Sequence, residues 1–454
     1  MTDYAAEGKS LARVDGKVIF VENTVPGDVV DVMVTRNKKD WAEGFATRYL
    51  QYAPDRVAPF CEHFGVCGGC QWQMLPYEKQ LVYKQKQVSD NLSRIGKLVL
   101  PPVEPIQGAA RTVGYRNKME YTFSNRRYLL PGELHDSSVT PIQDVAGFHA
   151  KGIFDKIVDI QTCHLQQEPG NQIRHAVKNR AISRGLPFYD IKLHQGWLRT
   201  MQLRICTTGE VMVNIVFGYD DPLHTPALLD DLLSRFPQIT TLLYTINTKW
   251  NDSMHDLSPR VYYGKGYVLE KLGDFMFKIG PKSFFQTNSE QAERLYTVTR
   301  DFAGLTGGQT VYDLYCGTGS IGIFLSRQAG KIIGVEVIDE AVRDARENAA
   351  LNQISHASFF TGDVSAVCDD DFFEKNGRPD VIITDPPRAG MHEKLVAKIS
   401  AMQAPVVVYV SCNPATQARD LSLLDEKYAV TRIQPVDMFP HTHHIENVVQ
   451  LRLR

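Results

Sequence analysis

The sequence predicts a multidomain α/β protein, in which a Rossmann-like domain follows a small β-barrel and an α+β central part. Three observations support this fold class. The chain has 454 residues, and at roughly 150 residues per domain this length suggests about three domains. Its first 55 residues contain only short alternating apolar runs. From residue 270 onward, apolar β-rich runs alternate with helical stretches, which is typical of a parallel sheet with crossover helices.

Composition narrows the class of protein. The 50 Lys and Arg residues nearly balance the 52 Asp and Glu residues, for a net charge of -2, so the whole chain is not a polybasic nucleic-acid binder. We find no targeting signal near the N-terminus and no run of about 18 apolar residues, so we expect a cytoplasmic protein without contact to a membrane. The eight cysteines are too few for a disulfide scaffold, and in that compartment clustered thiols favour metal binding or catalysis.

Residues 1–55 are predicted to form the barrel module. The runs LARVDGKVIFVEN and DVVDVMVTRN are separated by turn dipeptides at Asp15-Gly16 and Pro26-Gly27, and Asp-Gly between apolar runs is a strong hairpin signal. Small β-barrels of this kind often bind RNA.

Residues 56–269 are predicted to form the central domain. Within it, residues 76–130 carry ten Lys or Arg against four acids, a net charge of +6, interleaved with Tyr115, Tyr121, Phe123 and Tyr128. Basic and aromatic side chains together suit phosphate contacts and base stacking. The alternative is an ordinary solvated strand face.

Residues 270–454 are predicted to form the Rossmann-like domain. In it, Asp313-Leu-Tyr-Cys-Gly317-Thr-Gly319-Ser320 follows the first strand and opens a helix, and Glu336 ends the next strand. Glycines there let a ligand approach the helix N-terminus, and the acid can accept ribose hydroxyls. Because the third glycine of the dinucleotide fingerprint is missing, S-adenosylmethionine fits better than NAD.

Three further side chains are predicted at the same sheet edge, because each follows a strand. Asp363 closes the third strand, where it either contacts the ligand or caps a helix. Asp385 closes the fourth strand in Asp385-Pro-Pro-Arg-Ala-Gly, which resembles the loops of methyltransferases that act on planar groups. Cys412 follows PVVVYVS at an expected helix start, a position that favours a low thiol pKa and a nucleophilic role over a structural one.

The segment MFPHTHHIE holds three histidines and Glu446. A metal site is one interpretation, but the spacing and Pro440 favour a loop. A carboxylate near a nucleophilic cysteine suits general-base catalysis.

A cysteine cluster occurs early in the central domain. Cys61, Cys67 and Cys70 are spaced C-x5-C-x2-C, which indicates a metal site with a fourth ligand elsewhere, best supplied by Cys163. Zinc is the general expectation for such clusters, with His63 or His164 as possible ligands.

Together, SCNPATQARDL, MFPHTHHIE, DLYCGTGSIG, DPPRAG and SFFQTN resemble the RNA uracil-C5 methyltransferase family. The resemblance covers the catalytic half of the chain, and the N-terminal module is similar to the TRAM domain of many members. It implies a class I fold, with Cys412 as nucleophile and Glu446 as base. It also implies that S-adenosylmethionine is held by Gln286, Tyr315, Glu336 and Asp385, and that Cys61, Cys67, Cys70 and Cys163 hold a four-iron [4Fe-4S] cluster.

We therefore expect methylation of uridine C5 in RNA through a cysteine–C6 adduct, with ribosomal RNA favoured over transfer RNA, by a monomeric enzyme. Two alternatives stay open. One is an N- or C-methyltransferase that uses the Asp-Pro-Pro loop without covalent catalysis. The other is a non-catalytic iron–sulfur RNA-binding protein.

Overall fold

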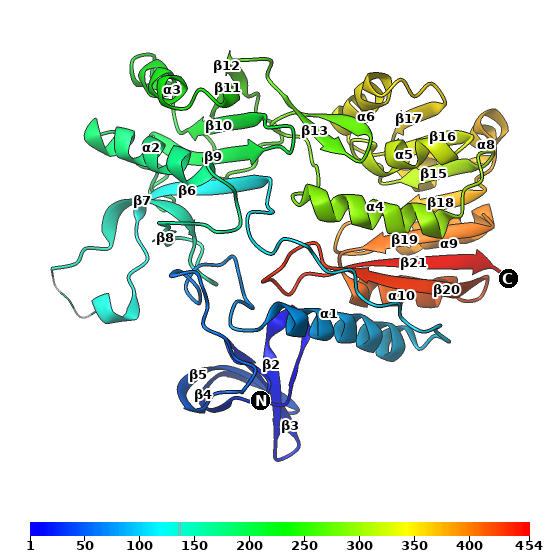
Figure 1. Ribbon diagram of the computed structural model, residues 1–454, viewed down its shortest axis with the longest axis horizontal. Helices are drawn as coiled ribbons and strands as arrows, with labels where there is room; N and C mark the ends of the chain where they lie inside the picture. The colour runs from blue at the N-terminus through cyan, green and yellow to red at the C-terminus, as the bar shows by residue number, and fades with distance from the viewer. Residues whose placement is uncertain (135, 137) are drawn as a thin grey trace.

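The computed structural model describes residues 1–134, 136 and 138–454 of the chain. Three large sheets dominate it: a five-stranded sheet near the N-terminus, a seven-stranded central sheet and a seven-stranded C-terminal sheet. In Figure 1 the N-terminal sheet lies below the other two, which stand side by side above it. The expected combination of a small β module, an α+β part and a Rossmann-like part is confirmed.

The N-terminal module is a sheet with strand order β1-β2-β3-β5-β4. Asp15 and Gly16 both have positive φ, 49° and 80°, as the two central residues of a type I′ hairpin turn require. Tyr4 and Val25 share a small core with Trp72, so the module packs against the segment that follows it. Its strands are β1 (Asp3–Tyr4), β2 (Ser10–Val14), β3 (Lys17–Glu22), β4 (Val29–Asn37) and β5 (Trp41–Gln51).

The central sheet has strand order β12-β11-β10-β9-β6-β7-β8. Trp197 and Phe217 are fully buried in its core and stack with ring centroids 4.3 Å apart. Helices α2 (Gly170–Ser183) and α3 (His224–Arg235) contribute to that core. The strands are β6 (Lys118–Arg126), β7 (Ile142–His149), β8 (Ile157–Asp159), β9 (Leu198–Ile205), β10 (Val211–Phe217), β11 (Ile239–Ile246) and β12 (Arg260–Tyr263).

A short hairpin of β13 (Val268–Leu272) and β14 (Phe275–Ile279) leads into the C-terminal sheet. That sheet has order β17-β16-β15-β18-β19-β21-β20, with five parallel strands followed by an antiparallel pair. The strands are β15 (Thr310–Leu314), β16 (Lys331–Glu336), β17 (Ala357–Thr361), β18 (Val381–Thr384), β19 (Val406–Ser411), β20 (Tyr428–Val436) and β21 (Glu446–Leu453).

Uninterrupted apolar runs form the middle of this sheet. Every residue of β18 and β19 is buried, as expected for parallel strands covered by helices on both faces. The helices are α4 (Ser289–Ala303), α5 (Ser320–Leu325), α6 (Asp339–Leu351), α7 (Val364–Val367), α8 (Asp370–Asn376), α9 (Glu393–Met402) and α10 (Pro414–Leu424).

Helix α1 (Tyr77–Asn91) and the π-helical turn η2 (Leu92–Gly96) pack on the C-terminal sheet although they precede the central sheet in sequence. Val88 and Leu92 share a core with Tyr409 and Leu421. Residues 104–107 then run along β20, with the Glu104 amide donating to the Ile433 carbonyl. The boundaries at residues 55 and 269 remain predictions, and this packing shows that residues 77–107 belong spatially beside the C-terminal sheet.

No helix in the described part of the chain is both long enough and apolar enough to cross a bilayer.

Candidate active site

The glycine-rich loop connects β15 to α5 at the carboxyl edge of the sheet. Tyr315, Gly317 and Gly319 all have positive φ, at 62°, 52° and 76°. A Cβ atom on Gly319 would lie 3.0 Å from the Phe359 ring and 3.1 Å from Ala345, whereas one on Gly317 would meet nothing within 4 Å. Glycine at 319 therefore lets the loop pack against its neighbours, and the space above Gly317 is open to a ligand.

Glu336 lies beside this loop at the end of β16, as predicted. Its carboxylate accepts a hydrogen bond from the Gly317 amide at 3.1 Å and another from the Ile338 amide at 3.0 Å. The side chain is nearly buried, so its orientation is fixed. A carboxylate held in this way retains lone pairs that can accept the two hydroxyls of a ribose.

Asp313, on β15, is a buried acid that the sequence motif contained but to which we assigned no role. One of its oxygens accepts from the Gly322 amide at 2.8 Å. The other has no partner among the described residues. Through the hydrogen bond from Gly322, this carboxyl joins the end of β15 to helix α5. Burial raises the pKa of Asp313 to about 7.

Asp363 and Tyr315 lie near each other at the same edge. Asp363 caps helix α7 by accepting from the Ser365 amide at 2.8 Å, which is the helix-capping alternative. Burial raises the pKa of Tyr315, and the neighbouring charge of Asp363 raises it further. Capping uses one oxygen of Asp363, so a cofactor contact through the other oxygen stays a prediction.

Gln286 lies in the loop before α4, held by contacts that local sequence patterns do not reveal. Asn117, just before β6, donates from its side chain to the Gln286 carbonyl at 3.0 Å and from its backbone to the Thr287 carbonyl at 2.7 Å. Asn288 caps α4 and donates to the Met438 carbonyl at 2.9 Å. The central sheet and the C-terminal loop together fix the position of Gln286.

Cys412 follows β19, and Asn413 caps α10 by accepting from the Ala415 amide at 3.1 Å. The position is as predicted, but the expected low thiol pKa is wrong. Burial raises the pKa of Cys412 to about 11, and the nearby acids Glu446 and Asp385 raise it too, while Arg388 lowers it. Burial is the largest cause of the raised pKa, and the two acids together outweigh Arg388.

Glu446 begins β21 and is 6% exposed. Burial and the neighbouring Asp385 raise its pKa well above the ordinary range, and Arg388 opposes them. Burial also raises the pKa of Asp385 to about 7. The fold thus brings Cys412, Glu446 and Asp385 within electrostatic range of one another.

Arg388 is a residue of this site that sequence analysis did not single out, although it stands in the Asp-Pro-Pro-Arg motif. Its guanidinium contacts a ring nitrogen of His444 at 2.8 Å. Its carbonyl accepts from the side chains of Asn413 and Thr416 at 3.0 and 3.2 Å. Arg388 lowers the pKa values of both Cys412 and Glu446.

The three histidines of the MFPHTHHIE segment lie in the loop between β20 and β21. Burial lowers the pKa of His441 to about 4, of His443 to about 4 and of His444 to about 3, so all three are neutral at pH 7. Within the described residues, no group of three His, Cys, Asp or Glu side chains is arranged to hold one metal ion. Because the histidines lie between the end of β20 at Val436 and the start of β21 at Glu446, the expectation of a loop is confirmed.

Cys61, Cys67, Cys70 and Cys163 line one cavity of about 410 Å³, together with Thr442 and His444 of the same loop. The Gly69 amide points at the Cys67 sulfur, 3.4 Å away. Burial raises the pKa of Cys67 to about 11 and that of Cys70 to about 12. The fold thus brings the four predicted ligands to one cavity, but among the described residues no three of these side chains are arranged to hold a metal ion, so the metal site stays a prediction.

The basic stretch at residues 76–130 is not the free RNA-binding face that its charge suggested. Tyr115, Tyr121 and Phe123 are core residues, exposed by 6%, 0% and 0%. Acids pair with most of the bases, and all of these acids except Asp90 lie outside the stretch. These pairs are Lys79–Asp55, Lys84–Asp437, Lys86–Asp3, Lys86–Asp90, Arg94–Asp90, Arg111–Glu290, Arg126–Asp190 and Arg127–Glu133.

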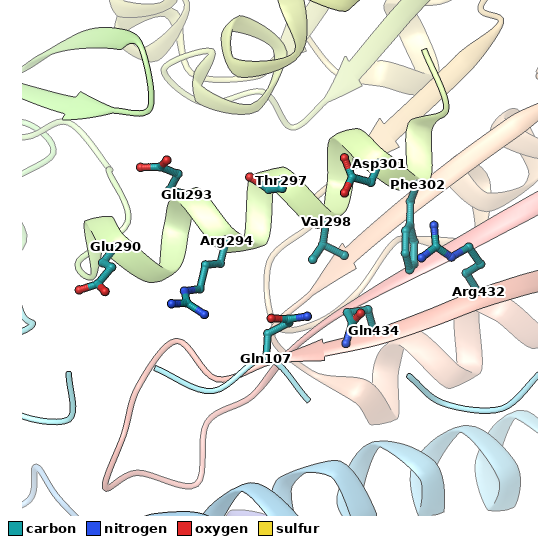
Figure 2. Close-up of a pocket in the computed structure, with 10 residues that line it drawn as sticks. All are labelled: Gln107, Glu290, Glu293, Arg294, Thr297, Val298, Asp301, Phe302, Arg432 and Gln434. Atoms are coloured by element: carbon teal, nitrogen blue, oxygen red, sulfur yellow. The ribbon is translucent and has the colours of Figure 1, made fainter. Parts of the chain in front are cut away.

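A second cavity, of about 430 Å³, lies between α4 and β20 (Figure 2). Arg432 lies over the Phe302 ring there, with its guanidinium carbon 4.1 Å from the ring centroid. The residues that line this cavity carry charges of both signs: Glu290, Glu293 and Asp301 together with Arg294 and Arg432. None of the predicted site residues lines this cavity, so size alone does not locate the active site.

A glycine loop, an acid at the end of the second strand and an Asp-Pro-Pro loop at one edge of this sheet define a class I S-adenosylmethionine-dependent methyltransferase. Comparisons with known proteins identify the family. The family model described as tRNA (Uracil-5-)-methyltransferase matches residues 258–454, and the TRAM domain model matches residues 2–46. An uncharacterized RNA methyltransferase of Bacteroides thetaiotaomicron is 51% identical, covering 99% of this chain and 100% of its own.

Two further relatives are also RNA methyltransferases by name. An uncharacterized RNA methyltransferase of Chlorobaculum tepidum is 42% identical over 99% of this chain and 94% of its own. The crystal structure of the Pyrococcus abyssi tRNA (uracil-54, C5)-methyltransferase in complex with S-adenosyl-L-homocysteine has a TM-score of 0.76 and 29% identity, covering 99% of this chain and 98% of that one. The chain belongs to the S-adenosylmethionine-dependent RNA uracil-5-methyltransferase family.

Proposed function

We propose that this enzyme methylates C5 of one uridine in RNA through a transient bond between Cys412 and C6 of the base. The observation that carries the proposal is the grouping of Cys412, Glu446 and Asp385 at the edge that also holds the glycine loop. A thiol, a buried carboxyl and a nucleoside pocket together are what this chemistry requires.

The proposed chemistry explains why both a nucleophile and a base are present. C5 of uracil is a weak nucleophile, so the Cys412 thiolate first adds to C6, forming an S–C6 bond and moving the C5–C6 π electrons onto C5 as an enolate. S-adenosylmethionine supplies the electrophilic methyl group for C5 and leaves as S-adenosylhomocysteine. Glu446 then takes the C5 proton, the C5–C6 double bond re-forms, and Cys412 leaves as thiolate. Dividing one difficult step into easier ones is the logic of covalent catalysis.

We propose that Gln286, Tyr315, Glu336, Asp363 and Asp385 hold the cofactor. The fixed carboxylate of Glu336 and the open space above Gly317 support a nucleoside at this edge. The target base has to reach Cys412, which is only partly exposed, so we propose that the uridine leaves its stack to enter the site.

The raised pKa of Cys412 affects how the nucleophile would become active. A thiol with a pKa of about 11 is protonated in the resting enzyme. Arg388 is the cation that opposes this, and a bound sulfonium cation would add to its effect. We therefore propose that the thiolate forms only when the site is filled, which would limit side reactions of the free enzyme.

Cys412→Ala tests the covalent route. Wild-type protein and the variant would be given labelled S-adenosylmethionine and total RNA, and denaturing gels would report a protein–RNA adduct. We expect no methyl transfer and no adduct from the variant. Unaltered turnover would instead support a methyltransferase without covalent catalysis, and RNA binding without any transfer by the wild type would support the non-catalytic alternative.

We propose ribosomal RNA, and specifically the large-subunit 23S RNA, as the substrate in preference to transfer RNA. The support is the combination of a TRAM domain with a four-cysteine site in one chain. The Pyrococcus abyssi relative is a transfer RNA enzyme, which keeps transfer RNA as the second candidate. Mapping 5-methyluridine in both RNA classes from cells with and without the gene decides between them, because only the true substrate loses the mark.

We propose that Cys61, Cys67, Cys70 and Cys163 hold a [4Fe-4S] cluster, with a structural role. Zinc requires four donors at about 2.0–2.3 Å from one point. The four cysteines line one cavity of about 410 Å³, but among the described residues no three of them are arranged around a single point. The support for a four-iron cluster is therefore the family resemblance and the presence of four cysteines, the ligand number of such clusters. Anaerobically purified protein should be brown and contain iron. Colourless protein with stoichiometric zinc and no iron would reject the cluster.

A further inference from the structure

The loop of residues 437–445 joins β20 to β21 and ends at Glu446. In Figure 1 this loop, drawn in red, extends from the C-terminal sheet toward the blue segment that bears the first cysteines. Its beginning is tied to α1 through Asp437, which accepts from Lys84 at 2.6 Å and from the Tyr77 hydroxyl at 2.8 Å. The chain before Glu446 is thus attached to a helix outside the C-terminal sheet.

The middle of the loop is held by Gln80 of α1, whose side chain is fully buried. Its Oε1 accepts from the His441 amide at 2.8 Å, and its Nε2 lies 3.2 Å from His441 Nδ1. The same Nε2 donates to the Trp72 carbonyl at 3.0 Å and to the Leu75 carbonyl at 2.9 Å. One amide group therefore bridges two segments: the loop that leads to Glu446 and the segment that follows the cysteines.

That second segment contacts the loop directly as well. The amides of Gln71 and Trp72, immediately after Cys70, both donate to the His441 carbonyl at 2.9 and 3.0 Å. Thr442 and His444 line the same cavity as the four cysteines. The cysteine segment and the loop therefore form one hydrogen-bonded unit with Gln80 at its centre.

The backbone of His441 indicates that this unit imposes a conformation on the loop. His441 has a φ of 66°, a left-handed conformation that is unfavourable for a non-glycine residue. Such a conformation persists only where surrounding contacts determine it. Here those contacts are made to both the amide and the carbonyl of the strained residue, and Gln80 supplies the one side chain among them.

We propose that Gln80 is a positioning residue for Glu446: it holds the loop of residues 437–445 against the cysteine segment so that the carboxyl faces Cys412 and Asp385. The inference rests on the proposed role of Glu446 as the base that removes the C5 proton. Without Gln80, His441 relaxes and the carboxyl moves. Addition of Cys412 and methyl transfer continue, but proton removal slows, so a methylated enzyme–RNA adduct accumulates.

The test is Gln80→Met, which keeps the length of the side chain and removes its hydrogen bonds. The matched control is Gln87→Met on the same helix, because the Gln87 side chain makes no hydrogen bond to a residue that the structure describes. Misplacement of a catalytic group by about 1 Å costs about 100-fold, so we expect turnover of Gln80→Met to fall about 10- to 100-fold. We expect the KM for S-adenosylmethionine to stay within about twofold of wild type and labelled adduct to accumulate on denaturing gels.

Normal turnover of Gln80→Met, or a loss of turnover without adduct, would overturn the inference. Gln80→Glu keeps the acceptor for the His441 amide and should lie between wild type and Gln80→Met. If thermal unfolding and iron content show that Gln80→Met does not fold, Gln80→Glu is the variant to be assayed in its place. Glu446→Gln and Cys412→Ala are measured in the same assay. They separate a failure of the proposed function from a failure of the role proposed for Gln80. Full activity of Cys412→Ala rejects the proposed function, whereas adduct with Glu446→Gln but not with Gln80→Met rejects only the role of Gln80.

Discussion

At the scale of single residues, the environment of Cys412 is the most informative feature of the site. Its thiol sits at a helix start, yet two neighbouring acids and burial keep it protonated. We expect Cys412→Ala to lose methyl transfer altogether, while Cys368→Ala, which alters a buried cysteine of another core, keeps it. Transfer of labelled methyl groups to RNA measures both. Residual activity of Cys412→Ala near that of Cys368→Ala would contradict the nucleophilic role.

Glu446 permits a second prediction at this scale. Replacing the base by Gln keeps its size and removes proton abstraction, a contribution of about 10²- to 10⁴-fold in rate. We expect Glu446→Gln to release product slower by this factor while the adduct still forms. Quenched-flow sampling with separation of free and protein-bound RNA gives both quantities. Equal loss of adduct and product would assign Glu446 to an earlier step.

The pH dependence follows from the two raised pKa values. Burial favours the neutral forms of Cys412 and Glu446, and the reaction needs both as anions, so the rate should rise with pH. The rise should be up to about tenfold per pH unit between about pH 6 and pH 9. Arg388 lowers both pKa values, so Arg388→Gln should shift the profile to higher pH. Single-turnover rates across this range test the sign, and a rate that falls with pH would reject it.

At the scale of elements, the glycine loop depends on backbone freedom at Gly319. This residue has a φ of 76°, and a Cβ added to it would lie 3.0 Å from the Phe359 ring, so Gly319→Ala introduces a strained backbone and a clash. The backbone alone costs about 1–2 kcal/mol. We expect a lower Tm and weaker binding of S-adenosylhomocysteine by calorimetry. Gly308→Ala, where an added Cβ meets nothing within 4 Å, is the control and should match wild type.

The buried pair of Lys84 and Asp437 permits a stability prediction for the attachment of α1. Both side chains are fully buried, and removing one partner of such a pair costs about 3–5 kcal/mol because the other charge stays unpaired. Lys84→Met should show this loss in the free energy of unfolding by urea. Lys84→Met combined with Asp437→Asn should recover a large part of it. A double variant as unstable as the single one would show that packing, not charge, dominates there.

At the scale of the whole molecule, the four cysteines line one cavity although they come from segments that are far apart in the chain. Cys163 lies near α2, where its amide donates to Asn171 at 2.8 Å, while the other three precede α1. With the proposed iron–sulfur cluster, Cys163→Ala should lose iron and lower the Tm, because metal binding is coupled to folding. Iron analysis and calorimetry of Cys163→Ala against Cys206→Ala, a cysteine outside the cavity, provide the comparison. Full iron content in Cys163→Ala would remove it from the ligand set.

Tertiary contacts also explain why residues 76–130 do not form the free basic face that their net charge suggested. Charge counted along residues 76–130 ignores acids that folding brings beside it, such as Asp437 against Lys84 and Glu290 against Arg111. Three of the aromatic residues among those bases, Tyr115, Tyr121 and Phe123, lie in the core of the central sheet. Net charge over a segment therefore did not predict charge over a surface.

The amino-acid sequence by itself determined the fold class, the glycine loop with Glu336, the position of Cys412 at the end of β19 and the loop that leads to Glu446. Those features depend on local patterns of apolar residues, glycines and turns, which neighbouring residues along the chain control. Only the tertiary structure decided the high pKa of Cys412, the position of Arg388 near it, and the hydrogen bond between Gln80 and His441. Each of these depends on charges and hydrogen bonds between segments that are far apart in the chain, and no local pattern encodes such distances.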